Sequence, residues 1–108
     1  MTVKELSEHK DFSVITMPEA EREIKNVYIG DLLSWVMGKA QQDDAWITIM
    51  NNVNVIAVAS LSDTACVILS EGVSLSEDIK VTAEAKGINV LTTEKSTYET
   101  AVILSGLI

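Results

Sequence analysis

Apolar residues recur along this chain with a spacing that changes from segment to segment. Between residues 31 and 40 the spacing is i, i+3, i+4, i+7, as in a helix with one buried face: Leu33, Val36, Met37 and Ala40. Leu32 and Trp35 widen that face, so the predicted helix is either enclosed by the core or covered by another subunit.

Short runs with the alternating or continuous apolar character of strands occur at five places. They are Phe12–Thr16, Val27–Ile29, Ala45–Met50, Cys66–Leu69 and Ile88–Thr93. The segment 53–61 fits a buried helix, although its β-branched residues also suit a strand. We predict a helix, because Ser62-Asp63-Thr64 then forms the turn into the strand that begins at Cys66.

Capping signals mark several helix ends. Thr2 with Glu5, and Ser96 with Glu99, have the spacing of a capping box, which predicts helices over residues 3–10 and from 97 to about 104. Ser76 followed by two acids predicts a third start, and Gly87 provides the left-handed residue that ends that helix.

Helices and strands alternate at short intervals through the second half of the chain. Such alternation favours parallel strands joined by right-handed crossovers. We therefore predict a single layered α/β domain over residues 1–108, with a mainly parallel sheet flanked by helices.

Composition narrows the classes of partner. The chain is 47% hydrophobic and 5% aromatic, which indicates a folded domain with an aliphatic core. Its formal net charge of −8 makes nucleic acid and membrane surfaces poor partners. No apolar leader or membrane-length apolar segment occurs, and the lone Cys66 has apolar neighbours, so we expect a cytoplasmic protein whose thiol is buried.

Polar residues follow three of the predicted strands. In open α/β sheets, ligands bind beyond the carboxyl ends of the strands. The hydroxyls, amides and single cation of these loops would suit a polar or phosphorylated small molecule, although the same hydroxyls also suit caps and turns. The candidate ligand-binding residues are Gly30, Asp31, Ser70, Gly72, Thr92, Thr93, Lys95 and Ser96.

The corner at Gly30-Asp31 is interpreted as a helix start. A phosphate cradle requires several glycines, and only one is present here. We expect the Asp31 carboxylate to occupy the helix amides that an anion would need.

Catalysis has little support in the sequence. The Walker loop, the CxxC pair, the HExxH helix and the GxSxG elbow are not found. An enzyme would need His9, Cys66 or carboxylates to meet in one cleft. We predict no catalytic residue, metal or cofactor, and a homodimer with Leu32, Trp35 and Leu107 in its interface.

The segments GDLLSWVMG, AWITI, IAVASLSD and GINVLTTEKSTYETA, in this order, resemble the DRTGG domain family, and the similarity extends from about Val3 to Leu104. The Asp-Arg-Thr-Gly-Gly signature that names the family is not spelled here; near its expected place the chain reads Met50-Asn51-Asn52-Val53 and Ser70-Glu71-Gly72.

This resemblance implies a fold similar to the amino-terminal domain of HPr kinase and a regulatory or protein-interaction role in bacterial signalling or metabolic control. The alternative that it implies is a sensor of an adenine nucleotide-like small molecule, by analogy with the modules inserted in certain pyrophosphatases. It also implies signalling kinases and iron–sulfur or hydrogenase-related proteins as partners.

Overall fold

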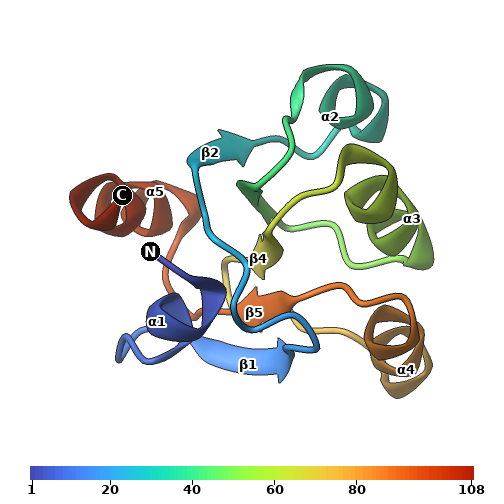
Figure 1. Ribbon diagram of the computed structural model, residues 1–108, viewed down its shortest axis with the longest axis horizontal. Helices are drawn as coiled ribbons and strands as arrows, with labels where there is room; N and C mark the ends of the chain where they lie inside the picture. Colours follow the sequence, from blue (N-terminus) through green and yellow to red (C-terminus); the bar gives the residue numbers. More distant parts are fainter.

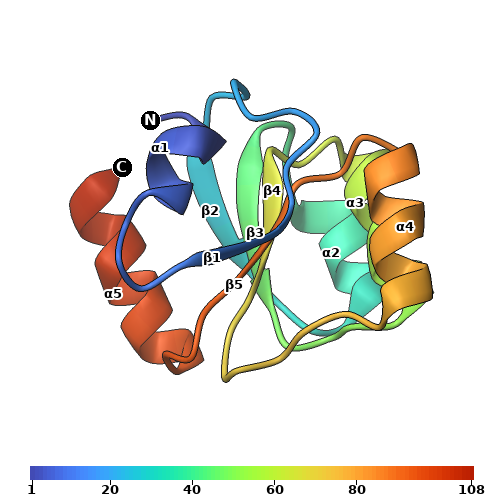
Figure 2. The same ribbon diagram turned by 90° about the horizontal axis from the view of Figure 1, so that it is seen from below.

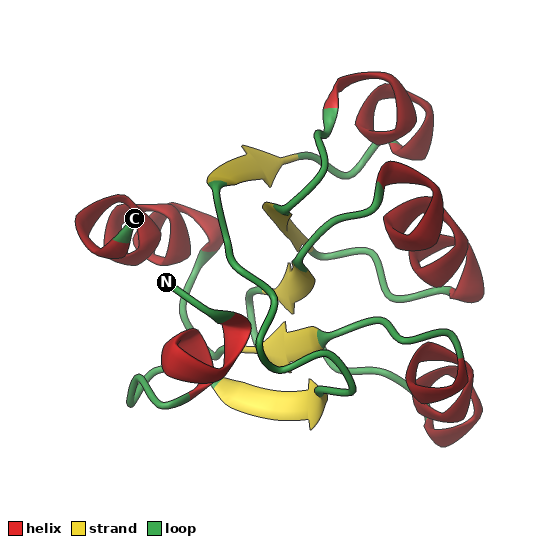
Figure 3. Ribbon diagram, viewed as in Figure 1, coloured by secondary structure: helices red, strands yellow, loops and turns green.

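The computed structural model describes residues 1–108 and contains five helices and five strands (Figures 1 and 3). The helices are α1 (Val3–Ser7), α2 (Leu33–Lys39), α3 (Val53–Ser62), α4 (Glu77–Ala85) and α5 (Thr97–Leu107). The strands are β1 (Ser13–Thr16), β2 (Asn26–Ile29), β3 (Asp44–Thr48), β4 (Cys66–Leu69) and β5 (Val90–Thr92). None of the helices is both long and apolar enough to cross a membrane.

The strands form one sheet in the order β1-β5-β4-β3-β2. β2, β3, β4 and β5 are parallel, and β1 pairs antiparallel with β5, so the predicted mainly parallel sheet is confirmed with one antiparallel edge. Helices α2, α3 and α4 cover one face of the sheet, while α1 and α5 cover the other (Figure 2). The result is a three-layer α/β domain.

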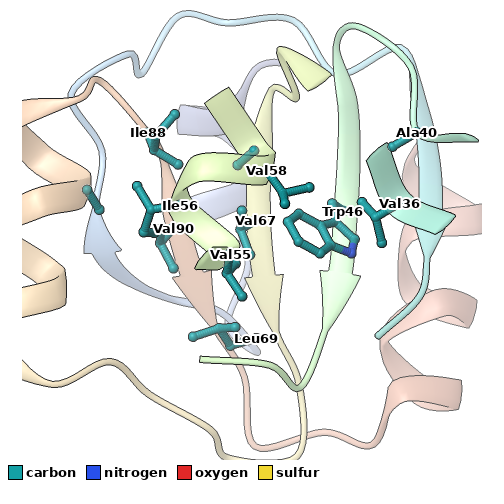
Figure 4. Close-up of a cluster of buried hydrophobic side chains, with 12 residues drawn as sticks. Val36, Ala40, Trp46, Val55, Ile56, Val58, Val67, Leu69, Ile88 and Val90 are labelled. Atoms are coloured by element: carbon teal, nitrogen blue, oxygen red, sulfur yellow. The ribbon is translucent and has the colours of Figure 1, made fainter. Parts of the chain in front are cut away.

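The core on the α2–α3–α4 face is built around Trp46 of β3. This side chain is fully buried, and its indole Nε1 donates to the Gly30 carbonyl oxygen at 2.9 Å. The surrounding side chains are almost all aliphatic (Figure 4). The hydrogen bond lets a large indole enter an aliphatic core without leaving its N–H unpaired.

A second core lies between the sheet and the pair α1 and α5. Val3 and Leu6 of α1 and Leu104 of α5 are fully buried there, in one cluster with Cys66 of β4. Alternate residues of β3 and β4 therefore supply opposite cores, as the two-residue period of a strand requires.

Most local predictions from the sequence are confirmed. Both capping boxes are present, Gly87 has a φ of +74°, and the ambiguous segment is the helix α3. The first helix is shorter than predicted: it ends at Ser7, and Glu8 is its C-cap residue. Ser76 is the N-cap of α4, but its hydroxyl bonds the Asp78 side chain at 2.6 Å in place of a backbone amide.

Candidate functional site

The loops that follow the parallel strands lie along the carboxyl edge of the sheet. Two of them, 70–73 after β4 and 93–96 after β5, are bound to each other by backbone hydrogen bonds. The Glu71 amide donates to the Lys95 carbonyl at 2.8 Å, and the Gly72 amide donates to the Thr93 carbonyl at 2.9 Å. The structure therefore brings together six of the eight candidate ligand-binding residues: Ser70, Gly72, Thr92, Thr93, Lys95 and Ser96.

The remaining pair, Gly30 and Asp31, follows β2 at the far side of the sheet. β3 and β4 lie between β2 and β5, which separates the strands by about 14 Å at ordinary strand spacing. Gly30 and Asp31 therefore belong to a different part of the carboxyl edge from the β4 and β5 loops.

The expectation that Asp31 caps the following helix is wrong. The N-cap of α2 is Leu32, which makes no side-chain cap. Asp31 Oδ1 instead accepts from the Thr48 hydroxyl at 2.8 Å and from the Ile49 amide at 3.1 Å. Because β2 and β3 are adjacent in the sheet, the end of β3 lies within hydrogen-bond distance of this carboxylate.

Most hydroxyls of the β4 and β5 loops are used inside the protein. Ser70 Oγ lies 2.7 Å from Thr97 Oγ1, and the Thr92 hydroxyl donates to the Val73 carbonyl at 2.6 Å. Thr93 Oγ1 accepts from the Lys95 amide at 3.2 Å, and Ser96 Oγ caps α5. These side chains hold the two loops in one conformation.

Helix α5 already has a carboxylate at its amino terminus. Glu71 Oε2 accepts from the Thr97 amide at 3.1 Å, and Ser96 Oγ accepts from the Glu99 amide at 3.1 Å. The positive end of the helix dipole is thereby neutralised from within the chain. A ligand anion would have to displace Glu71 to reach these amides.

The position of Glu71 depends on an uncommon backbone geometry. Glu71 and Gly72 both have positive φ, at 62° and 73°. A Cβ on Gly72 would lie 2.6 Å from Glu94 Oε2, so the two loops approach each other closely at this glycine. The tight turn directs the Glu71 side chain to α5.

A small cavity opens next to the β5 loop. Its volume is about 210 Å³, and every residue that lines it is polar or charged: Lys10, Asp11, Ser13, Thr92, Thr93, Glu94 and Lys95. An adjoining groove of about 360 Å³ shares Asp11 and Lys95 and is bounded by Tyr98, whose side chain is 77% exposed. Neither Lys10 nor Lys95 forms an ion pair.

Lys10, Asp11, Ser13 and Tyr98 were not predicted as candidate residues. The first three enter the site because β1 runs antiparallel to β5, which places the start of β1 beside the end of β5. Nothing in the local sequence around Lys10 indicates that pairing. Tyr98 follows the Ser96 cap, so the first turn of α5 was the available signal.

Comparison with known families decides the assignment of the chain. The family model described as "DRTGG domain" matches residues 5–107, nearly the whole length. The chain belongs to the DRTGG domain family. No curated protein matches it.

One solved structure of similar fold contains the CBS and DRTGG domains of the regulatory region of Clostridium perfringens pyrophosphatase, complexed with its activator diadenosine tetraphosphate. The TM-score is 0.71 at 16% sequence identity. The alignment covers 86% of this chain and 41% of the other chain, so this DRTGG domain spans less than half of the length of that neighbour. At this identity the likeness establishes the fold.

Neither Cys66 nor His9, the candidate nucleophile and base of an enzyme, lines any of the four cavities of this DRTGG domain. Cys66 is fully buried in β4, where desolvation raises the pKa of its thiol to about 12. His9 lies after α1 against Phe12, and its Nδ1 accepts from the Asp11 amide at 3.2 Å. No group of three His, Cys, Asp or Glu side chains is placed to hold a metal ion.

The three predicted interface residues lie around one edge of the DRTGG domain. Leu32 and Trp35 are each 60% exposed, at the start of α2 and directly after β2. Leu107 is 39% exposed at the end of α5, which flanks β2 on the opposite face of the sheet (Figure 1).

Proposed function

We propose that this DRTGG domain is a non-enzymatic regulatory or protein-interaction module that acts as a homodimer. The observation that carries the proposal is the group of exposed apolar side chains beside β2, in which Leu32 and Trp35 are each 60% exposed. Exposed apolar groups of this size near each other are typical of protein interfaces. The net charge of −8 argues against a nucleic-acid or membrane surface as the partner.

The polar side chains at the carboxyl edge of the sheet, and the buried thiol of β4, support a role without catalysis. The Glu71 carboxylate is bound to the α5 amide of Thr97, and the Ser70 hydroxyl is bound to the Thr97 side chain. The Cys66 thiol, with a pKa of about 12, has no thiolate at physiological pH. The Glu71 and Ser70 side chains thus hold the loops together, and the Cys66 thiol is part of the core. Partners among signalling kinases and iron–sulfur or hydrogenase-related proteins follow from the family resemblance alone.

Size-exclusion chromatography with light scattering at micromolar concentration tests the homodimer. We expect twice the 11.7 kDa mass of the chain. A Leu32→Glu, Trp35→Glu variant should run as a monomer with an unchanged circular dichroism spectrum, while Val81→Glu, which alters an equally exposed residue of α4, should remain a dimer. A monomeric wild-type chain would contradict the homodimer.

A second function, the sensing of an adenine nucleotide-like ligand, is favoured by the cavity beside β5. Lys10 and Lys95 both line it and neither has a carboxylate partner, although the chain is strongly acidic. The adjoining groove presents Tyr98, whose exposed ring could stack on a base. The neighbouring pyrophosphatase structure is complexed with diadenosine tetraphosphate, which supports testing this ligand class.

Thermal unfolding with ATP, ADP and diadenosine tetraphosphate tests the sensor. A ligand at ~100 times its Kd should add about 2.7 kcal/mol to the free energy of unfolding. The Lys10→Met, Lys95→Met variant should lose this gain, whereas Lys80→Met, on α4 and not among the residues that line the cavity, should keep it. The absence of any shift with all three nucleotides at high concentration would contradict the sensor.

A further inference from the structure

We propose that the two copies join through β2, which pairs antiparallel with β2 of the second copy and merges two five-stranded sheets into one of ten strands. This inference rests on the proposed homodimer and names its surface and its register. The occupant of the open edge is a second copy of this chain. The first argument comes from the difference between the two edges of the sheet.

The two edge strands differ in how well they are protected from pairing. β1 has a register shift between Val14 and Thr16 and is followed closely by Pro18. Bulges and prolines at sheet edges prevent association with other strands. β2 pairs with β3 without interruption over its four residues and contains neither device.

The open part of the β2 edge has definite limits. Before β2, the Ile24 amide donates to the Met1 carbonyl at 2.8 Å, and Thr2 forms an isolated antiparallel β-bridge with Glu23. The N-terminal residues therefore cover the edge up to Ile24. From Asn26 to Ile29 β2 pairs only with β3, so its other side can accept a strand.

Apolar side chains flank the open edge on both faces of the sheet. On the α5 face, a groove of about 440 Å³ runs between β2 and α5 and is lined mainly by apolar residues: Val27, Tyr28, Ile29, Ala101, Leu104 and Ile108 among them. On the other face, Leu32 and Trp35 follow the strand. A second β2 in the edge would bring the same apolar groups of the partner against these surfaces.

The geometry of a symmetric strand pair restricts the register. Two identical antiparallel strands are related by a two-fold axis perpendicular to the sheet, so each face of one copy continues into the same face of the other. Residues directly opposite each other must share a face, and in β2 Val27 packs into the α1–α5 core while Tyr28 packs into the α2–α3 core. A register that pairs Val27 with Tyr28 is therefore excluded, and the axis must pass through a residue.

Charge complementarity selects Tyr28 as that central residue. With Tyr28 opposite itself, Lys25 lies opposite Asp31 at both ends of the pair. The Lys25 side chain is 68% exposed and its Nζ lies 3.5 Å from Asp43 Oδ2 within its own chain, while Asp31 Oδ2 has no hydrogen-bond partner there. An axis through Val27 would instead place Lys25 opposite Ile29, a charge against an apolar side chain.

The same register also matches the apolar residues of the strand. Val27 lies opposite Ile29 of the second copy, and Ile29 opposite Val27, on the face that carries α5. Ile29 is 48% exposed in the single chain, so this pairing buries an otherwise solvated β-branched side chain. The register centred on Tyr28 thus places both the charges and the apolar side chains against complementary partners.

Cysteine cross-linking tests both the surface and the register. With the axis at Tyr28, a Tyr28→Cys variant places two thiols directly opposite, at a Cα separation of about 4.5–5.5 Å that a disulfide can span. In Val27→Cys or Ile29→Cys the identical thiols are diagonal neighbours about 7–8 Å apart, beyond that reach. We expect oxidised dimer on a non-reducing gel for Tyr28→Cys and little for the two single variants, while the double variant Val27→Cys, Ile29→Cys should cross-link. The native Cys66 is fully buried and should not react.

A second variant, Ile29→Lys, tests the same surface without removing the Tyr28 side chain, which packs against the core. Ile29→Lys places a cation on the exposed side of β2 and should convert the dimer to a monomer by light scattering. Val81→Lys, with a 62% exposed valine on α4, is the matched control and should stay dimeric.

The outcomes separate this inference from the homodimer itself. A wild-type monomer would overturn both. A wild-type dimer that persists in Ile29→Lys and does not cross-link through residue 28 would overturn the β2 surface and leave the homodimer standing. Stronger cross-linking through Val27→Cys alone would overturn the register.

Discussion

Asp31 accepts a hydrogen bond from the Thr48 hydroxyl, with 2.8 Å between Oδ1 and Oγ1. The same oxygen accepts from the Ile49 amide at 3.1 Å, and Thr48 Oγ1 accepts from the Met50 amide at 3.1 Å. The carboxylate therefore connects the end of β2 to the end of β3. One aspartate that resembles a helix cap in the sequence holds two adjacent loops at the carboxyl edge.

Removal of this carboxylate should destabilise the domain. We expect Asp31→Ala to lower the free energy of unfolding by about 1 to 2 kcal/mol, because the buried Thr48 hydroxyl and a loop amide lose a charged acceptor. Urea denaturation measures the change. Glu84→Ala, an exposed acid of α4 without a hydrogen-bond partner, is the control and should leave stability within about 0.5 kcal/mol. Equal stabilities would contradict the role assigned to Asp31.

The ion pairs of Arg22 should make the free energy of unfolding fall at acid pH. Its guanidinium donates to Asp43 Oδ1 at 2.6 Å and to Asp63 Oδ1 at 2.9 Å, linking two residues with left-handed backbone. The hydrogen bond from Arg22, with Lys25 adding to it, holds the pKa of Asp43 below its ordinary value of 3.8. A carboxyl whose folded pKa is depressed stabilises the fold above its unfolded pKa, and that contribution disappears as the pH falls through the folded pKa.

The wild-type chain should therefore lose more stability on acidification than an Arg22→Gln variant. Urea midpoints at about pH 7 and about pH 3 measure the two losses. Lys80→Gln, which removes a cation that has no ion pair, should lose as much stability on acidification as the wild type does. If Arg22→Gln and the wild type lost the same stability on acidification, the pKa of Asp43 would not depend on the guanidinium.

Two glycines should respond in opposite directions to alanine. Gly72 has a φ of +73°, and its Cβ would meet Glu94 Oε2 at 2.6 Å, so Gly72→Ala should cost about 1 kcal/mol of stability. Gly38 lies in α2 with open space for at least 4 Å around the position that a Cβ would take, so Gly38→Ala should add about 0.5 to 1 kcal/mol. Thermal unfolding measures both. A change of the same sign at the two positions would contradict the assigned backbone strain.

The Cys66 thiol should be inert in the folded protein. Desolvation raises its pKa to about 12, and no part of the side chain is exposed. A chromogenic disulfide reagent at about pH 8 should react only after guanidinium is added, when the thiol recovers its ordinary pKa of about 8.5. A Val81→Cys thiol on α4, at a position that is 62% exposed and outside the proposed interface, provides the positive control, and fast reaction of native Cys66 would mean that β4 opens readily.

Local features explain why much of the fold could be predicted. A capping box joins residues three apart, so the boxes at Thr2 and Ser96 depend only on neighbouring sequence. Gly87 ends α4 for a similarly local reason. The buried strand Cys66–Leu69 could be recognised because it is apolar on both faces, as a central parallel strand must be.

The candidate site could be predicted only in part. The β4 and β5 loops meet because their strands are adjacent, and the order of the residues suggested that edge. Lys10 enters the site through the antiparallel pairing of β1 with β5, a contact between segments about eighty residues apart in the chain. Sequence periodicity describes one element at a time and carries no information on which strand lies beside it.

By itself the sequence determined the helices, the strands, most of their ends and the family, because caps and apolar periods act within a few residues. Only the tertiary structure decided that Asp31 binds Thr48 instead of its own helix, that Lys10 stands beside Lys95, and that β2 is left as an open edge. A side chain with several donors within local reach bonds the one that packing brings nearest, and packing depends on the strand order of the whole sheet.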